Sequence, residues 1–77
     1  GEYLGLAKNS ISGGFEIENC DISNGDGLLI KNPNGEIFGS LVQKVLGQKI
    51  ICSKNCPKIF KGAQIWRNKN LKFYNFP

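Results

Sequence analysis

The stretch Gly25-Asp26-Gly27-Leu28-Leu29-Ile30 is a tight turn that leads directly into an apolar run. One residue later comes Asn32-Pro33-Asn34-Gly35, and an Asn-Gly pair between apolar runs is the strongest short-range signal of a β-hairpin. Both central residues of a type I′ turn need a positive φ, which Asn34 and Gly35 tolerate. We therefore expect a short strand at 28–30, apolar on both faces, and a long return strand at 37–45.

Shorter strands are expected on both sides of this hairpin, because glycine, asparagine and proline interrupt the chain roughly every 8–12 residues. Residues 15–18 alternate apolar and acidic side chains, which is the pattern of a half-buried strand. Asn9-Ser10 and Gly13-Gly14 are expected to bracket a turn, and Ile22 is expected to enter the core from a loop. The expected strands are residues 3–8, 15–18, 28–30, 37–45, 49–53 and 63–67.

Two segments carry weaker signals. Residues 54–61 contain Pro57 and are expected to form a loop with at most one helical turn. Residues 69–76 fit neither the strand period nor the helix period, so both a short helix and an extended tail stay open.

The fold class that follows is all-β. Short strands in a chain of 77 residues have to hide their edges, and a compact barrel does this best. We expect a single domain over residues 1–77: a small closed or partly open antiparallel β-barrel of about six short strands with at most one short helical turn. Because the chain begins with Gly1 and contains no methionine, we expect it to be a piece of a larger protein.

The composition speaks against catalysis by this chain alone. It contains no histidine, the commonest general base and metal ligand. Paired acids remain, Glu16 with Glu18 and Asp21 with Asp26, and we favour structural roles for them over acid–base roles. We therefore expect no catalytic residue and no cofactor. We also expect no membrane span, since no apolar run approaches ~20 residues.

Cys20, Cys52 and Cys56 are an odd set with no regular framework. They fall short of the four ligands of a structural zinc site or an iron–sulfur cluster, so we expect no metal. A disulfide between Cys52 and Cys56 is geometrically conceivable across a turn. We favour plain thiols in a reducing cytoplasm.

The Gly25-Asp26-Gly27 corner has two interpretations. It lacks the lysine and the following helix of a phosphate-binding loop. We favour a structural turn in which glycine supplies a positive φ and Asp26 accepts hydrogen bonds from nearby backbone amides, with Asn34 and Gly35 forming the second structural turn.

The charge of the chain is unevenly distributed. Residues 1–43 hold two lysines and six acids, a net charge of −4, whereas residues 44–77 hold seven lysines, one arginine and no acid, a net charge of +8. This asymmetry fits a polyanionic partner, or a solvated lysine surface in a fold that mixes the two halves. The basic end also interleaves cations with aromatic rings, as surfaces that bind single-stranded nucleic acids do. The candidate nucleic-acid contacts are Arg67, Lys69, Lys72, Lys58 and Lys61, while Trp66, the only tryptophan, is expected in the core.

Three motifs in this order resemble a known family. They are Asn24-Gly25-Asp26-Gly27-Leu28, then Gly39-Ser40-Leu41-Val42-Gln43-Lys44-Val45, then Gly62-Ala63-Gln64-Ile65-Trp66-Arg67-Asn68. The pattern resembles the accessory β-domain that follows the catalytic barrel in the U32 peptidase (collagenase-like protease) family, and Gly5 suits the opening strand of that domain. The chain departs from the pattern at Lys69-Asn70, where the family usually has an aspartate.

The resemblance implies an accessory module without activity of its own. In that family the activity lies in a separate TIM-like domain, as do the cluster-binding cysteines of some relatives, so none of these is carried over to this chain. Relatives are described as peptidases, and several act in the hydroxylation of RNA bases or of a quinone precursor. The implied partners are the rest of the parent chain and RNA.

Two main hypotheses follow. The first is a non-catalytic barrel that helps to position a substrate such as RNA. The second is a structural or protein-interaction barrel that packs on the parent's catalytic domain, with an exposed apolar patch drawn from Tyr3, Phe60, Tyr74 or Phe76. A free-standing peptidase or metal domain ranks below both.

Overall fold

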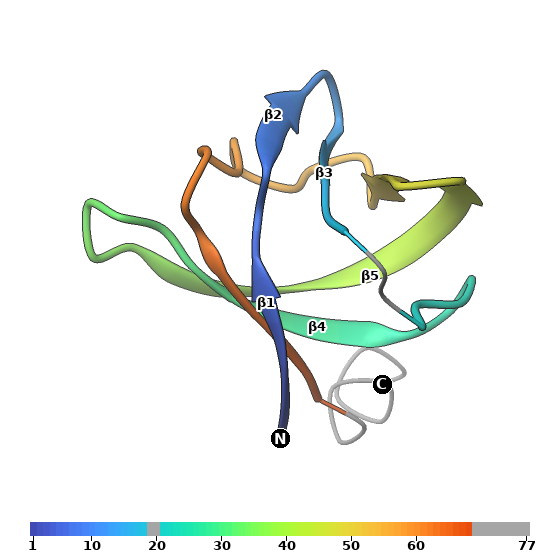
Figure 1. The fold of residues 1–77 in the computed structure, drawn as a ribbon, viewed down its shortest axis with the longest axis horizontal. Coiled ribbons are helices and arrows are strands. Elements are labelled where there is room, and N and C mark those ends of the chain that lie inside the picture. Colours follow the sequence, from blue (N-terminus) through green and yellow to red (C-terminus); the bar gives the residue numbers. More distant parts are fainter. Residues whose placement is uncertain (19–20, 69–77) are drawn as a thin grey trace.

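Seven antiparallel strands form a single sheet in the computed structural model, which describes residues 1–18 and 21–68 (Figure 1). No helix occurs in these two ranges. The strands are β1 (Glu2–Leu6), β2 (Asn9–Ile11), β3 (Gly14–Glu16), β4 (Gly27–Lys31), β5 (Ile37–Leu46), β6 (Lys49–Cys52) and β7 (Gln64–Arg67). The all-β prediction is confirmed, and residues 69–76, expected to form either a short helix or an extended tail, lie outside the described residues.

The sheet curls into a partly open barrel. Its strand order is β1-β7-β4-β5-β6-β3-β2, so β1 and β2 lie at opposite edges although only two residues separate them in sequence. The amide of Ala7 donates to the carbonyl of Ala63 (2.8 Å) and that of Lys8 to the carbonyl of Glu16 (2.6 Å). The chain therefore steps from one edge of the sheet to the other, and Figure 1 shows β1 and β2 as one nearly continuous path.

The predicted hairpin forms, with Leu28 opposite Ser40 and Lys31 opposite Ile37. Its turn differs from type I′. The amide of Gly35 bonds the carbonyl of Asn32 (2.9 Å), so Pro33 and Asn34 are the central residues of that turn. Proline fixes φ near −65°, which is incompatible with type I′. The positive φ falls on Gly35 instead, at 93°.

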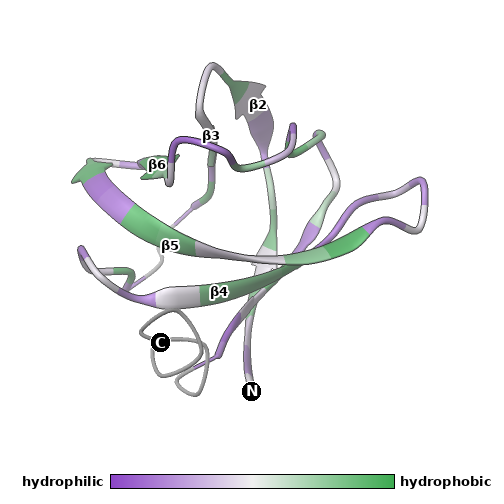
Figure 2. Ribbon diagram, turned by 180° about the vertical axis from the view of Figure 1, so that it is seen from behind, coloured by the Kyte–Doolittle hydropathy of each residue, from purple (hydrophilic) through white to green (hydrophobic). Residues whose placement is uncertain are grey.

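Strand β5 belongs to both halves of the barrel, one formed with β4, β7 and β1 and the other with β6, β3 and β2. Its first half pairs with β4 and its second half with β6, and the register shifts between Val42 and Lys44. Such an irregularity bends a strand, which lets β5 turn the corner between the two halves. Figure 2 shows β4 and β5 as two curved ribbons lying along each other.

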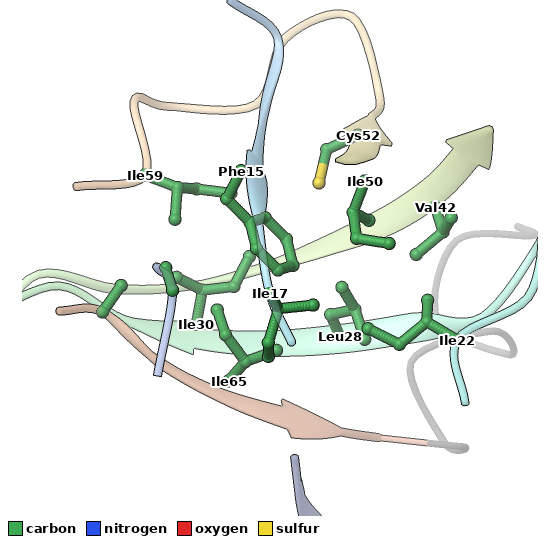
Figure 3. Close-up of a cluster of buried hydrophobic side chains, with 12 residues drawn as sticks. Phe15, Ile17, Ile22, Leu28, Ile30, Val42, Ile50, Cys52, Ile59 and Ile65 are labelled. Atoms are coloured by element: carbon green, nitrogen blue, oxygen red, sulfur yellow. The ribbon is translucent and has the colours of Figure 1, made fainter. Parts of the chain in front are cut away.

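The core lies inside this curled sheet (Figure 3). Phe15, Leu28, Ile30 and Ile65 are 0% exposed. Ile22 is buried as predicted, and Ile59 fills the core from the loop before β7. The full cluster consists of Ala7, Phe15, Ile17, Ile22, Leu28, Ile30, Val42, Ile50, Cys52, Ile59, Ala63 and Ile65.

The turn that Asn9-Ser10 and Gly13-Gly14 were expected to bracket lies at Ser12 and Gly13, but the strand before it was not expected. Asn9 and Ser10 belong to β2, which pairs with β3 so that Asn9 faces Glu16. The side-chain amide of Asn9 donates to Oε1 of Glu16 at 3.2 Å. The sequence did not predict this strand, because a tertiary partner supplies the hydrogen bonds that make a polar segment extended.

Asn32 joins the hairpin to the loop before β7. It is 1% exposed, and its Nδ2 donates to the carbonyl of Lys58 (2.8 Å) and to Oε1 of Glu36 (3.1 Å). Its Oδ1 accepts from the amide of Phe60 at 2.9 Å. This single side chain satisfies backbone groups that are 26 and 28 residues away in sequence.

We predict that Asn32→Ala lowers the free energy of unfolding by roughly 2–3 kcal/mol, because it leaves a backbone donor and a backbone acceptor without their partner. Urea denaturation followed by the fluorescence of Trp66 measures this loss. Asn34→Ala is the matched control, since Asn34 is exposed and its side chain accepts from the amide of Glu36 within the same turn (2.9 Å). Its loss should stay below about 1 kcal/mol. Equal losses in the two variants would contradict the role of Asn32.

Candidate functional site

Arg67, one of the candidate nucleic-acid contacts, lies against acidic groups of its own chain. Its side chain is only 17% exposed, and its guanidinium lies 3.6 Å from a carboxylate oxygen of Glu2 and 3.9 Å from one of Asp26. It also donates to the carbonyl of Asp21. The positive charge is therefore largely balanced within the barrel, and the contacts join β7 to the Gly25-Asp26-Gly27 corner.

The corner itself is fixed to β5 by its backbone. Gly25 donates to the carbonyl of Val42 (2.7 Å), and Val42 donates back to the carbonyl of Asp26 (2.9 Å). Gly25 has a φ of 86°, and the carboxylate of Asp26 accepts from the amide of Ser23 at 2.9 Å. These contacts are those of a turn that starts a strand, with Gly27 as the first residue of β4.

We predict that Arg67→Ala lowers the free energy of unfolding by roughly 1–3 kcal/mol, because Asp26 loses its cationic neighbour in a partly buried setting. Lys61→Ala removes the same charge from an exposed side chain and should change stability by no more than about 0.5 kcal/mol. Thermal or urea unfolding of the two variants provides the comparison. An Arg67→Ala variant as stable as Lys61→Ala would show that the acidic contacts of Arg67 do not hold the corner.

Lys58 and Lys61 lie on the loop before β7, and both are exposed. The ammonium group of Lys58 lies 5.0 Å from the centroid of the Phe60 ring, which is 38% exposed. The side chain of Asn32 hydrogen-bonds the backbone of this loop at Lys58 and at Phe60, so the loop side chains project from a fixed main chain. Lys69 and Lys72 lie outside the described residues.

Trp66 is not a core residue, contrary to the prediction. Ile65 takes the inward position of β7, and strand alternation turns Trp66 to the outside, where it is half-buried. Its ring packs on that of Tyr3, with centroids 5.3 Å apart and planes at 59°. Trp66 faces Tyr3 on one neighbouring strand and Leu29 on the other.

A bulge in β1 places two of its apolar residues on this outer side. Tyr3 pairs with Trp66 and Leu6 pairs with Gln64, and the register shifts between Tyr3 and Gly5. Tyr3 and Leu6 are three residues apart and would point to opposite faces of a regular strand. The extra residue restores a common face, and both side chains are about half exposed, at 51% and 53%.

Together these residues form what we call the outer face, two rows across β1, β7, β4 and β5. One row runs Tyr3, Trp66, Leu29 and Gly39, and the other runs Leu6, Gln64, Lys31 and Ile37. Ile37 is 59% exposed, and Lys31 is the only charged residue among the eight. Tyr3 and Phe60 are exposed apolar residues, as the second hypothesis expected.

Two shallow grooves meet on the outer face. A groove of about 440 Å³ is lined by Leu29, Lys31, Ile37 and Trp66 together with Gly1 and Asn68. A smaller one of about 270 Å³ is lined by Leu6, Lys31 and Gln64 with the hairpin turn. Lys31 lines both. Leu6 also lines a third groove, shared with Tyr3, Glu18 and Lys61, so Lys61 lies close to the same surface.

The acids weighed for catalysis have partners on the surface. Glu16 accepts from Asn9 at 3.2 Å, and Glu18 lies 3.5 Å from the ammonium group of Lys8. Within residues 1–18 and 21–68, no group of three or more histidine, cysteine, aspartate or glutamate side chains is placed to hold a metal ion. The same part of the chain contains no helix that is long and apolar enough to cross a membrane.

Comparisons with protein-family models, with curated proteins and with solved structures found no match to this chain. The resemblance to the U32 accessory domain therefore depends on the three sequence motifs alone.

Sequence reasoning missed Lys31, Leu29 and the outward position of Trp66. One signal was available, because residues 28–30 are apolar on both faces of the strand. When one face of such a strand packs in the core, the other face presents a second apolar surface. Lys31 gave no signal, because its place between two grooves depends on residues from β7, β5 and β1.

Proposed function

We propose that this domain is a non-catalytic, cytoplasmic β-barrel module that helps a larger U32-type protein to position a single-stranded RNA substrate on its outer face. The observation that carries the proposal is that Trp66 packs on Tyr3 and lines a groove together with Lys31, on a surface otherwise almost free of charge. Partly exposed rings next to lysines are the usual parts of a surface that stacks bases and tracks phosphates.

The energetics of such a surface fit these residues. Stacking of a base on an aromatic ring contributes about 1–3 kcal/mol and does not depend on base identity. Lys31 lies between the two grooves, Lys61 lines the third groove, and Lys58 belongs to the same loop as Lys61. Three phosphate contacts to a single strand give a slope of about −2 for log affinity against log salt concentration.

Arg67 is not assigned to this surface in the proposal. Its guanidinium already contacts Glu2, Asp26 and Asp21, so a phosphate would have to compete with contacts inside the chain. Lys69 and Lys72 stay candidate contacts.

The single tryptophan gives a direct test, since a base stacked on Trp66 quenches its fluorescence. Titration with an oligouridylate should quench Trp66 at low salt and weaken as salt rises. Tyr3→Ala should weaken binding at least about fivefold, from the loss of stacking. Lys31→Ala should lower the magnitude of the salt slope by about 0.7.

Lys44→Ala is the matched control, because Lys44 is an exposed lysine on the far half of β5, opposite Ile51. It should leave the affinity and the slope nearly unchanged. No quenching at low salt, or equal effects of Lys31→Ala and Lys44→Ala, would refute RNA binding by the outer face.

The alternative function is a structural barrel that packs its outer face on the catalytic domain of the parent protein. The exposure of Tyr3, Leu6 and Ile37 favours it, since half-exposed large apolar side chains on one face of a sheet are typical of protein interfaces. The RNA titration separates the two functions. If RNA does not quench the fluorescence of Trp66 at any salt concentration, the result supports the structural function.

A further inference from the structure

Cys52 and Cys56 lie at the end of β6 and in the turn that follows it. Cys52 is the last residue of β6, is 2% exposed and faces Val42 of β5. Its amide donates to the carbonyl of Gly13 at 2.8 Å, so its backbone is held between β5 and the turn that precedes β3. Figure 3 shows its sulfur within the core cluster.

The chain turns directly after Cys52 and brings the second cysteine back. The amide of Cys56 donates to the carbonyl of Ser53 at 3.0 Å, which closes a turn over 53–56. Cys56 is half-buried and packs against the core cluster that contains Cys52. Both cysteines are free thiols, and each lies close enough to shift the pKa of the other; Sγ of Cys56 also donates to the carbonyl of Pro57 at 3.3 Å.

The surroundings of the two sulfurs differ. The pKa of Cys56 is lowered to about 7, chiefly by hydrogen bonding from Cys52 and to a smaller extent from the Ser40 hydroxyl, while burial and the charge on Glu36 act in the opposite direction. The hydrogen bond to Cys56 and burial raise the pKa of Cys52. Ser40 is itself held by Ser53, with hydroxyl oxygens 3.0 Å apart. The more exposed sulfur is therefore the better nucleophile near neutral pH.

We propose that Cys52 and Cys56 are a redox-active dithiol, which a small-molecule disulfide such as oxidised glutathione converts to an intramolecular disulfide. The Cys56 thiolate attacks one sulfur of the oxidant, forms a mixed disulfide and expels one glutathione thiolate. Cys52 then loses its proton to solvent, attacks Sγ of Cys56 and expels the second glutathione. Two protein thiols become one cystine, and one oxidant disulfide becomes two thiols.

The arrangement assigns the two steps to different cysteines. Cys56 is accessible enough to meet an external disulfide, whereas Cys52 is shielded from it within the core cluster against which Cys56 packs. A shielded partner favours the intramolecular second step over a second mixed disulfide. Closure ties the start of the loop that carries Lys58 and Lys61 to the end of β6. The proposal does not depend on what these lysines bind.

Oxidation of a Cys20→Ser protein tests the pairing, because that variant keeps only the two thiols in question. After equilibration with oxidised glutathione, tryptic peptides should show Cys52 linked to Cys56, with a mass lower by two hydrogen atoms and no labelling by maleimide. Cys56→Ser in the same background should not form this link. Maleimide labelling of both cysteines in fully oxidising buffer, or links between molecules only, would overturn the proposal.

The order of attack has its own test in the reduced Cys20→Ser protein. Iodoacetamide should modify Cys56 well before Cys52, with a rate that rises about tenfold per pH unit below pH 7 and levels off above it, as the reactive thiolate forms. Cys52→Ala removes the hydrogen-bond donor and should move the Cys56 profile to higher pH. Cys52→Ser, which keeps a donor, should restore most of the shift, and Trp66 fluorescence checks that both variants are folded. Equal rates at the two cysteines would overturn the assignment of Cys56 as the attacking thiol.

Discussion

The burial of Leu28 and Ile30 on the inner side of β4 is the constraint from which the other features follow. Both side chains are fully buried, and each contributes roughly 1.5–3 kcal/mol through removal from water. Strand β4 pairs with β5 on one side and β7 on the other, so its orientation sets that of its neighbours. Because side chains alternate, Leu29 and Lys31 must then point outward. The candidate binding surface is thus the geometric consequence of how the core is filled.

Closing so small a barrel requires polar groups to be buried as well. The backbone of the loop that contains Ile59 packs against the hairpin. Asn32 hydrogen-bonds both a backbone donor and a backbone acceptor of that loop. At the opposite end of β4, Arg67 and Asp26 hold the corner where the strand begins. A buried polar side chain is tolerated only with its partners in place, so these contacts specify one arrangement of the loops.

The sequence was sufficient for elements that local patterns define, and insufficient where a distant partner decides. The hairpin and the strands at 28–30 and 37–45 follow from alternation and turn residues. β2 does not, because a polar Asn9-Ser10 segment becomes extended only when β3 lies beside it. Trp66 was expected inside on the basis of its residue type, yet Ile65 occupies the only inward position available at that point of β7. The contacts of Arg67 join residues more than 40 positions apart in sequence, so a local sequence pattern cannot predict them.

The fold also changes the meaning of the charge asymmetry between the two halves of the chain. Strand pairing places acidic residues of the first half beside basic residues of the second: Glu16 faces Lys49, and Glu2 and Asp26 flank Arg67. Much of the field that the linear sequence implies is therefore cancelled locally. What matters for a polyanion is then the position of the remaining cations rather than their number. Lys31 comes from the acidic half, yet it is the charge that the fold places between two grooves, one of which it lines together with Trp66.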